Sequence, residues 1–170
     1  GQRKVGETEK VDVVVDLRGH TYQASAGART FTVYSGSTLS VIDTIGGAQV
    51  TGSYVKDLGA TINITLGTVN LYGGTFSTTN TENANEGGII AVGADSNLNI
   101  YDGATIIGGP ATMGGAIYTK GGNVTVYGGL IQGGTVSYET SNPVGGAIAV
   151  INGIFIMTGG KVTGGIATST

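Results

Sequence analysis

The chain of 170 residues contains no cysteine and no tryptophan, and it has only two prolines. Without cysteine it can form no disulfide, no thiol nucleophile and no cysteine-ligated zinc or iron–sulfur site. No uninterrupted apolar stretch approaches the roughly 18 residues of a helical membrane span, so we expect none. No signal peptide precedes Gly1, and we therefore expect a mature product or a piece excised from a longer chain.

Charged residues are also scarce. They make up 11% of the chain, and eight basic residues against eleven acidic ones leave a formal net charge of −3. A nucleic-acid partner requires clustered lysines and arginines that neutralise phosphates, so none is expected. The opening "GQRKVGETEK" holds several charges of both signs that offset one another. This composition predicts a flexible N-terminal arm or cap over residues 1–10.

Glycine, by contrast, is abundant, with 33 residues, and 39% of the chain is hydrophobic. The glycines lack the every-third-residue spacing of collagen, and the chain is too apolar for a disordered tail. The composition therefore favours a β-rich fold with many turns.

The sequence repeats itself with a period of about 30 residues. Five segments of alternating apolar and polar residues begin at positions 31, 62, 89, 116 and 147: "FTVYSGSTLSVID", "INITLGTVNLYGG", "IIAVGADSNLNIYDG", "AIYTKGGNVTVYGG" and "AIAVINGIFIMTGG". A period of this length indicates a solenoid. Alternation within short runs indicates strands and not helices.

The alternation also assigns an inward face. The predicted inward residues are Ile62, Ile64, Val69 and Leu71; Ile90, Val92, Leu98 and Ile100; Ile117, Val124 and Val126; Ile148, Val150, Phe155 and Met157; and, from a third strand, Val50, Phe76, Ile106, Ile131 and Val162. Like residues then stack from coil to coil at about 4.8 Å. The predicted fold is all-β: a single right-handed parallel β-helix over residues 11–170, with about five coils of three short strands.

Glycine pairs separate the predicted strands, as at Gly114–Gly115, Gly128–Gly129 and Gly133–Gly134. We interpret them as corners, where the chain bends with φ > 0 and lies close to the coil above. A phosphate-binding glycine loop would need a helix after it, and no helical period follows any of the pairs.

The segments "VDVVVDLRGHTYQAS" and "FTVYSGSTLSVID", followed by units of "GGAI" and "VTVYGG", resemble the right-handed parallel β-helix regions of large bacterial cell-surface and secreted proteins. These belong to the broad pectin-lyase-like group. The "GGAI" at 114–117 and 145–148 is also similar to the GGA-type repeat of chlamydial polymorphic outer-membrane proteins. The resemblance implies an extracellular or cell-surface location.

Enzymes of the pectin-lyase-like group use clustered aspartates in a groove, and glycoside hydrolysis needs two carboxyl groups roughly 5–10 Å apart. Here the outward column carries no such pair. Asp102 is the acidic residue next to it, and glycines hold the equivalent positions 73 and 128. His20, the only histidine, has no assignable nucleophile or orienting acid. We therefore expect no enzyme activity.

One loop, "TENANE" at 81–86, gathers oxygen ligands of the kind that suits calcium. A solvated loop explains the same composition, and that is the interpretation we keep. The sequence thus predicts no metal and no cofactor.

The best candidates for binding lie in an outward column and in the loops beside it. Tyr72, Tyr101 and Tyr127 occupy equivalent positions in consecutive repeats, where their rings can stack into an amphipathic strip. High β propensity of tyrosine explains the column equally simply. The loops at 77–86 and 135–144 contribute Glu82, Tyr138 and Glu139, and loops on one edge of a solenoid commonly form its binding surface.

Two hypotheses of function remain. The first is a non-catalytic extracellular module of a bacterial surface protein, structural or adhesive, whose partner is a protein or glycan surface, or identical subunits stacked head to tail into a filament. The alternative is a carbohydrate-binding β-helix module that uses the tyrosine column and the edge loops.

Overall fold

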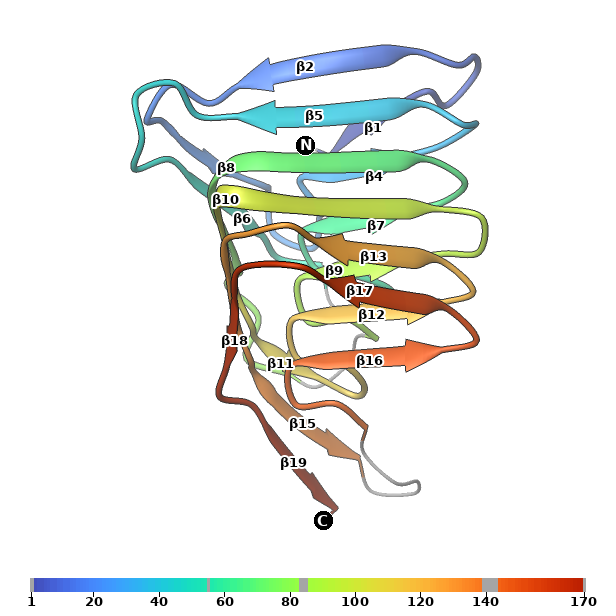
Figure 1. Ribbon diagram of the computed structural model, residues 1–170, viewed down its shortest axis with the longest axis vertical. Coiled ribbons are helices and arrows are strands. Elements are labelled where there is room, and N and C mark those ends of the chain that lie inside the picture. The colour runs from blue at the N-terminus through green and yellow to red at the C-terminus, as the bar shows by residue number, and fades with distance from the viewer. Residues whose placement is uncertain (1, 55, 83–85, 139–143, 170) are drawn as a thin grey trace.

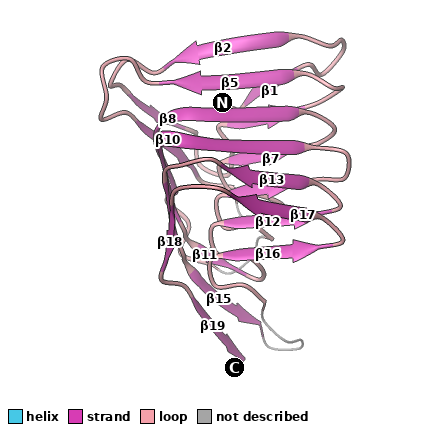
Figure 2. Ribbon diagram, viewed as in Figure 1, coloured by secondary structure: helices cyan, strands magenta, loops and turns pink. Residues whose placement is uncertain are grey.

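The computed structural model describes residues 2–54, 56–82, 86–138 and 144–169. Over this part of the chain the regular elements are all β-strands, and there is no helix (Figure 2). The chain winds in coils that stack along the long axis of the molecule (Figure 1), and consecutive coils pair through parallel strands. The fold is therefore the predicted all-β parallel β-helix, with about six turns where the sequence predicted about five.

Sheet A forms one wall of the solenoid. Its six parallel strands are, in order, β1 (Arg3–Val5), β4 (Phe31–Val33), β7 (Ile62–Ile64), β9 (Ile90–Val92), β12 (Ile117–Lys120) and β16 (Ile148–Ile151). Their first residues from β4 onward are in register, so that Ile62 pairs with both Phe31 and Ile90. Strand β1 lies within the segment expected as an arm or cap. It extends the sheet because Val5 is buried, only 7% exposed, and pairs with Val33.

Sheet B folds around a bend and forms two walls. Its first side contains β2 (Asp12–Asp16), β5 (Thr38–Ile42), the first halves of β8 (Thr68–Thr78) and β10 (Asn97–Ile107), β13 (Asn123–Val126) and β17 (Ile154–Met157). Its second side contains β3 (Thr21–Gln23), β6 (Gln49–Gly52), the second halves of β8 and β10, β14 (Leu130–Gln132) and β18 (Lys161–Thr163). The register between β8 and β10 shifts at the bend, between Ile100 and Gly103.

A third, short sheet was not predicted. It joins β11 (Pro110–Ala111), β15 (Thr135–Tyr138) and β19 (Ile166–Ser169) in parallel. These strands add a fourth element to the last three coils. Strands of two to four residues are too short to show a recognisable alternation of apolar and polar residues in the sequence.

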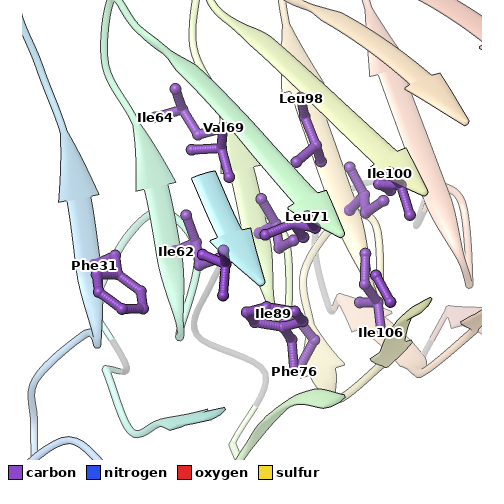
Figure 3. Packing of buried hydrophobic residues seen from close by; sticks show 14 of the residues in the cluster. Phe31, Ile62, Ile64, Val69, Leu71, Phe76, Ile89, Leu98, Ile100 and Ile106 are labelled. Carbon is purple, nitrogen blue, oxygen red and sulfur yellow. The ribbon is translucent and has the colours of Figure 1, made fainter. Parts of the chain in front are cut away.

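The core is one continuous column of aliphatic side chains between sheets A and B (Figure 3). Ile62, Leu71, Ile100 and the other inward residues predicted for the middle coils are fully or almost fully buried. In the last coil Val150, Met157 and Val162 are 37–40% exposed. They belong to β16, β17 and β18, which are outer strands of their sheets, so only one neighbouring coil covers them.

The glycines meet two separate requirements. Gly114 and Gly129 have φ of 61° and 82°, the left-handed conformation expected at corners. Gly134 instead lies where two backbones touch: a Cβ at this position would be 2.0 Å from the carbonyl oxygen of Gly109. The glycine pairs thus allow both turning and close packing of the chain.

The connections from the second side of sheet B to sheet A differ in length from coil to coil. From β6 onward they span residues 53–61, 79–89, 108–116 and 133–147, and the last two ranges include β11 and β15. Single parallel bridges link their ends, joining Leu58 to Glu86, Glu86 to Met113 and Met113 to Val144. The connections therefore stack on the same edge of the solenoid although their lengths are unequal.

Candidate functional site

Across β5, β8, β10 and β13 the outward face of the first side of sheet B carries regular columns of uncharged side chains, which β2 continues with Asp12 and Asp16. The register of β5, β8, β10 and β13 aligns two columns: Thr38, Thr68, Asn97 and Asn123; and Ser40, Asn70, Asn99 and Thr125. Two residues further along the chain, ring contacts join Tyr72, Tyr101 and Tyr127 into a third column, with Ile42 at the equivalent position of β5. We call this surface the polar face. All twelve side chains are half-buried or exposed, so they are accessible to a partner.

Hydrogen bonds between coils order the amide groups of the polar face. Asn99 Nδ2 donates to Asn70 Oδ1 over 2.8 Å, and Asn70 Nδ2 donates to Ser40 Oγ over 3.2 Å. In the next column Asn123 Nδ2 donates to Asn97 Oδ1 over 3.1 Å. A side-chain amide has two N–H donors, so each donating group keeps one for a partner while the first fixes its orientation.

The three tyrosines stack on one another, as the sequence predicted. The ring centroids of Tyr72 and Tyr101 are 4.3 Å apart with an interplanar angle of 16°, and those of Tyr101 and Tyr127 are 5.0 Å apart with an angle of 14°. The column stands at the bend of sheet B, directly before Gly73 in β8. Equivalent positions in adjacent coils thus place the rings in contact.

Stacking determines which part of each ring a partner can reach. The faces of Tyr101 are covered by its two neighbours. The outer faces of the stack turn toward Ile42 beside Tyr72 and toward Thr158 beside Tyr127, which occupy the next positions in the column. Tyr72 and Tyr127 at the two ends of the stack are 42% and 49% exposed, whereas neither face of the central ring is free for a sugar to lie on.

The hydroxyl of Tyr101 stays neutral at physiological pH. Burial raises the pKa of Tyr101 above its ordinary value of 10.0, and a hydrogen bond with Tyr72 raises it further. Tyr101 therefore adds a neutral hydroxyl, and no charge, to the polar face.

The other predicted binding residues that the structure describes belong to other elements of the fold. Glu82 is exposed in the connection that follows β8. Tyr138 is the last residue of β15, where its backbone pairs with Ser169. Glu139 lies outside the described residues. Over the described residues, no hydrogen bond or ring contact joins Glu82 to the tyrosine stack.

The remaining candidates show no catalytic or metal arrangement among the described residues. His20 is exposed, and the asparagines of "TENANE" fall in the undescribed segment 83–85. Over the parts of the chain that the structure describes, no three His, Cys, Asp or Glu side chains are close enough to hold a metal ion. Asp102 lies against Gly128, where an added Cβ would be 1.8 Å from Asp102 Oδ1.

One surface feature was missed by sequence reasoning. A groove of about 300 Å³ lies on the outward face of sheet A and is lined by Leu58, Ala91, Val92, Gly93, Ala94, Tyr118 and Lys120. The sequence does contain a signal for this groove: two small residues, Ala91 and Gly93, occupy the outward positions of their repeat. In the adjacent repeats these positions hold Asn63 and Thr65, and Tyr118 and Lys120.

The comparisons with known proteins give no relative. No protein-family model, no curated protein and no solved structure matches the chain. A search of the described residues for helices finds none of the length and apolar character that crossing a membrane requires. The resemblance to bacterial β-helix regions therefore remains an expectation from the sequence.

Proposed function

We propose that the chain is a non-catalytic structural and adhesive β-helix module of a bacterial surface protein, acting outside the cell. The observation that carries the proposal is the polar face: rows of uncharged hydroxyl and amide groups, repeated from coil to coil and ordered by hydrogen bonds. Such a face suits contact with an extended, uncharged partner surface.

The physical advantage of this arrangement is its preorganisation. The amides of Asn70 and Asn99 are already oriented, so binding immobilises few free rotamers and loses less entropy. Each contact is weak by itself, worth about 0.5–1.5 kcal/mol for a hydrogen bond. Repetition over four strands allows several such contacts to act together.

The carbohydrate-binding alternative uses the same face in a different way. A glycan is one class of uncharged partner, but the stack of Tyr72, Tyr101 and Tyr127 offers it ring edges and hydroxyls. Glycan binding here would depend on hydrogen bonds from the asparagine columns, with the tyrosine hydroxyls beside them.

The test compares binding of the chain to a glycan array and to immobilised extracellular surface proteins. A double variant, Asn70→Ala with Asn99→Ala, should reduce binding to the native partner by at least about tenfold, because it removes two ordered donors. Asn63→Ala on sheet A is the matched control and should have no effect.

Each outcome of this test is informative. Loss of binding to a protein surface supports the adhesive function, whereas glycan binding that Tyr101→Ala also abolishes favours the carbohydrate alternative. Adhesion that survives the double variant contradicts the assignment to the polar face.

End-to-end assembly is a second candidate, favoured by the outer strands of sheet B. If β2 of a second copy continued the register of β17, Val13 would stack on Phe155 and Val15 on Met157. The half-exposed apolar side chains of both strands would then be covered, and the contact would repeat without closing. Light scattering and electron microscopy test this assembly, and persistent monomers at high concentration would exclude it.

A further inference from the structure

The groove on sheet A is one coil wide and has a simple structural cause. Ala91 in β9 pairs with Asn63 in β7 on one side and with Tyr118 in β12 on the other. A methyl group thus lies between two larger side chains on the outward face. Gly93 repeats the situation two residues further along, between Thr65 and Lys120. We call this depression the β9 groove.

Almost all of the groove wall is apolar. Leu58 closes one side, Tyr118 and the methylene stem of Lys120 form another, Ala91, Val92 and Gly93 form the floor, and Ala94 lies at the exposed rim. Tyr118 is held rigidly, since only 3% of it is exposed. The groove is therefore a preformed apolar site at the lower end of the size range of small-ligand pockets.

Lys120 is the one charged residue of the groove wall. It is exposed. Over the described residues the ion pairs are Lys4–Glu7 and Arg29–Asp57, so Lys120 has no carboxylate partner there. Among the acidic groups around this wall, Glu86 is engaged with the hydroxyl of Tyr118, Asp57 beside Leu58 pairs with Arg29, and Asp95 follows Ala94 at the rim. An apolar body with one negative end would match this combination.

We propose that the β9 groove binds an aliphatic carboxylate, such as a medium-chain fatty acid. The hydrocarbon chain lies over Gly93 and Ala94, beside Leu58, and the carboxylate pairs with the ammonium group of Lys120. The proposal does not depend on the adhesive function of the polar face, which is a different surface of the solenoid.

The lining distinguishes this ligand from a peptide. A bound peptide would bury amide groups, and each amide without a hydrogen-bond partner costs free energy. The groove side chains other than Tyr118 and Lys120 carry no polar atom. A ligand with a single polar end avoids that cost.

Two quantities should characterise the binding. Each additional methylene group that enters the groove should tighten binding by about fourfold, until the groove is full. The exposed pair with Lys120 should contribute a factor of up to about fivefold. Decanoate should therefore bind more tightly than octanoate, and octanoate more tightly than hexanoate.

The experiment titrates the whole chain with these three carboxylates and with decan-1-ol, and it follows backbone amide resonances by NMR. Binding should shift the signals of Gly93 and Ala94. Lys120→Glu should weaken decanoate binding by at least about fivefold while the affinity for decan-1-ol stays unchanged. Lys161→Glu, at another exposed lysine, is the matched control.

Filling the groove is the second arm of the test. Ala91→Leu should abolish decanoate binding, and Ala94→Phe at the exposed rim should do the same without disturbing the buried floor. Circular dichroism and thermal unfolding establish that each variant is folded. The proposal is overturned if a folded Ala94→Phe variant binds decanoate normally, if Lys120→Glu has no effect, or if a peptide ending in leucine binds more tightly than decanoate.

Discussion

The guanidinium of Arg29 lies over the ring of Tyr54, with its central carbon 3.8 Å from the ring centroid. The same side chain donates from Nε to the carbonyl oxygens of Leu58 and Gly59, over 2.7 and 2.9 Å, and forms an ion pair with Asp57. Arg29 is only 8% exposed. One buried cation thus fastens the connection 53–61 to the preceding coil.

Replacing Arg29 with alanine should therefore destabilise the fold. The change removes charge-assisted hydrogen bonds and a cation–π contact, and it should lower the free energy of unfolding by about 2–4 kcal/mol. Urea unfolding followed by circular dichroism measures the loss. Lys56→Ala, at an exposed cation in the same connection, should change stability by less than about 0.5 kcal/mol. Equal effects of the two variants would contradict the role assigned to Arg29.

Two glycine substitutions should separate close packing from backbone conformation. Gly134→Ala places a methyl group 2.0 Å from the Gly109 carbonyl oxygen. We therefore expect the free energy of unfolding to fall by about 3 kcal/mol or more. At Gly46, φ is 87° and nothing lies within 4 Å of an added Cβ. Gly46→Ala should thus lower the free energy of unfolding only by the penalty of holding alanine in the left-handed conformation, about 1–2 kcal/mol. Chemical denaturation of both variants gives the comparison, and a smaller loss for Gly134→Ala would refute the packing argument.

The alternation of inward and outward residues makes adjacent isoleucines unequal. Ile106 is fully buried and Ile107 is 37% exposed. Ile106→Ala should lower the free energy of unfolding by about 2–5 kcal/mol because it leaves a cavity in the core. Ile107→Ala should cost less than about 1 kcal/mol. Equilibrium unfolding of the pair tests the register of β10 directly.

Tyr118 should make stability depend on alkaline pH. Burial, followed by a hydrogen bond with Glu86, raises its pKa from 10.0 to about 12. Between these values the unfolded chain loses the phenolic proton and the folded chain keeps it, so the free energy of unfolding falls as pH rises. The contribution is fully present below about pH 10. Urea unfolding across this window should show a shallower decline for Tyr118→Phe than for the native chain, and identical slopes would exclude the shift.

The sequence predicted the central coils well because their alternation is strict. Val69 and Leu71, or Leu98 and Ile100, are separated by one outward residue, and the repeat aligns them with equivalents in the next coil. The same alignment placed Tyr72, Tyr101 and Tyr127 in one column. Stacking geometry then followed from the spacing between coils.

Other features depend on contacts that a repeat pattern does not encode. Strand β1 is three residues long and carries two charges, so only its pairing with β4 identifies it as part of sheet A. The β9 groove arises from the difference in size between Ala91 and its neighbours in adjacent coils. This difference in size predicts a groove only when the pairing of the strands in adjacent coils is known.

The connections between sheet B and sheet A differ in length without any change in the register of the core strands. Residues 53–61 and 79–89 differ in length, yet β7 and β9 enter sheet A in the same register. A change in the length of a connection therefore leaves the aliphatic column undisturbed. This edge of the solenoid is where foreign peptides could be inserted for display, one per coil and stacked along the axis, on a frame that stays constant.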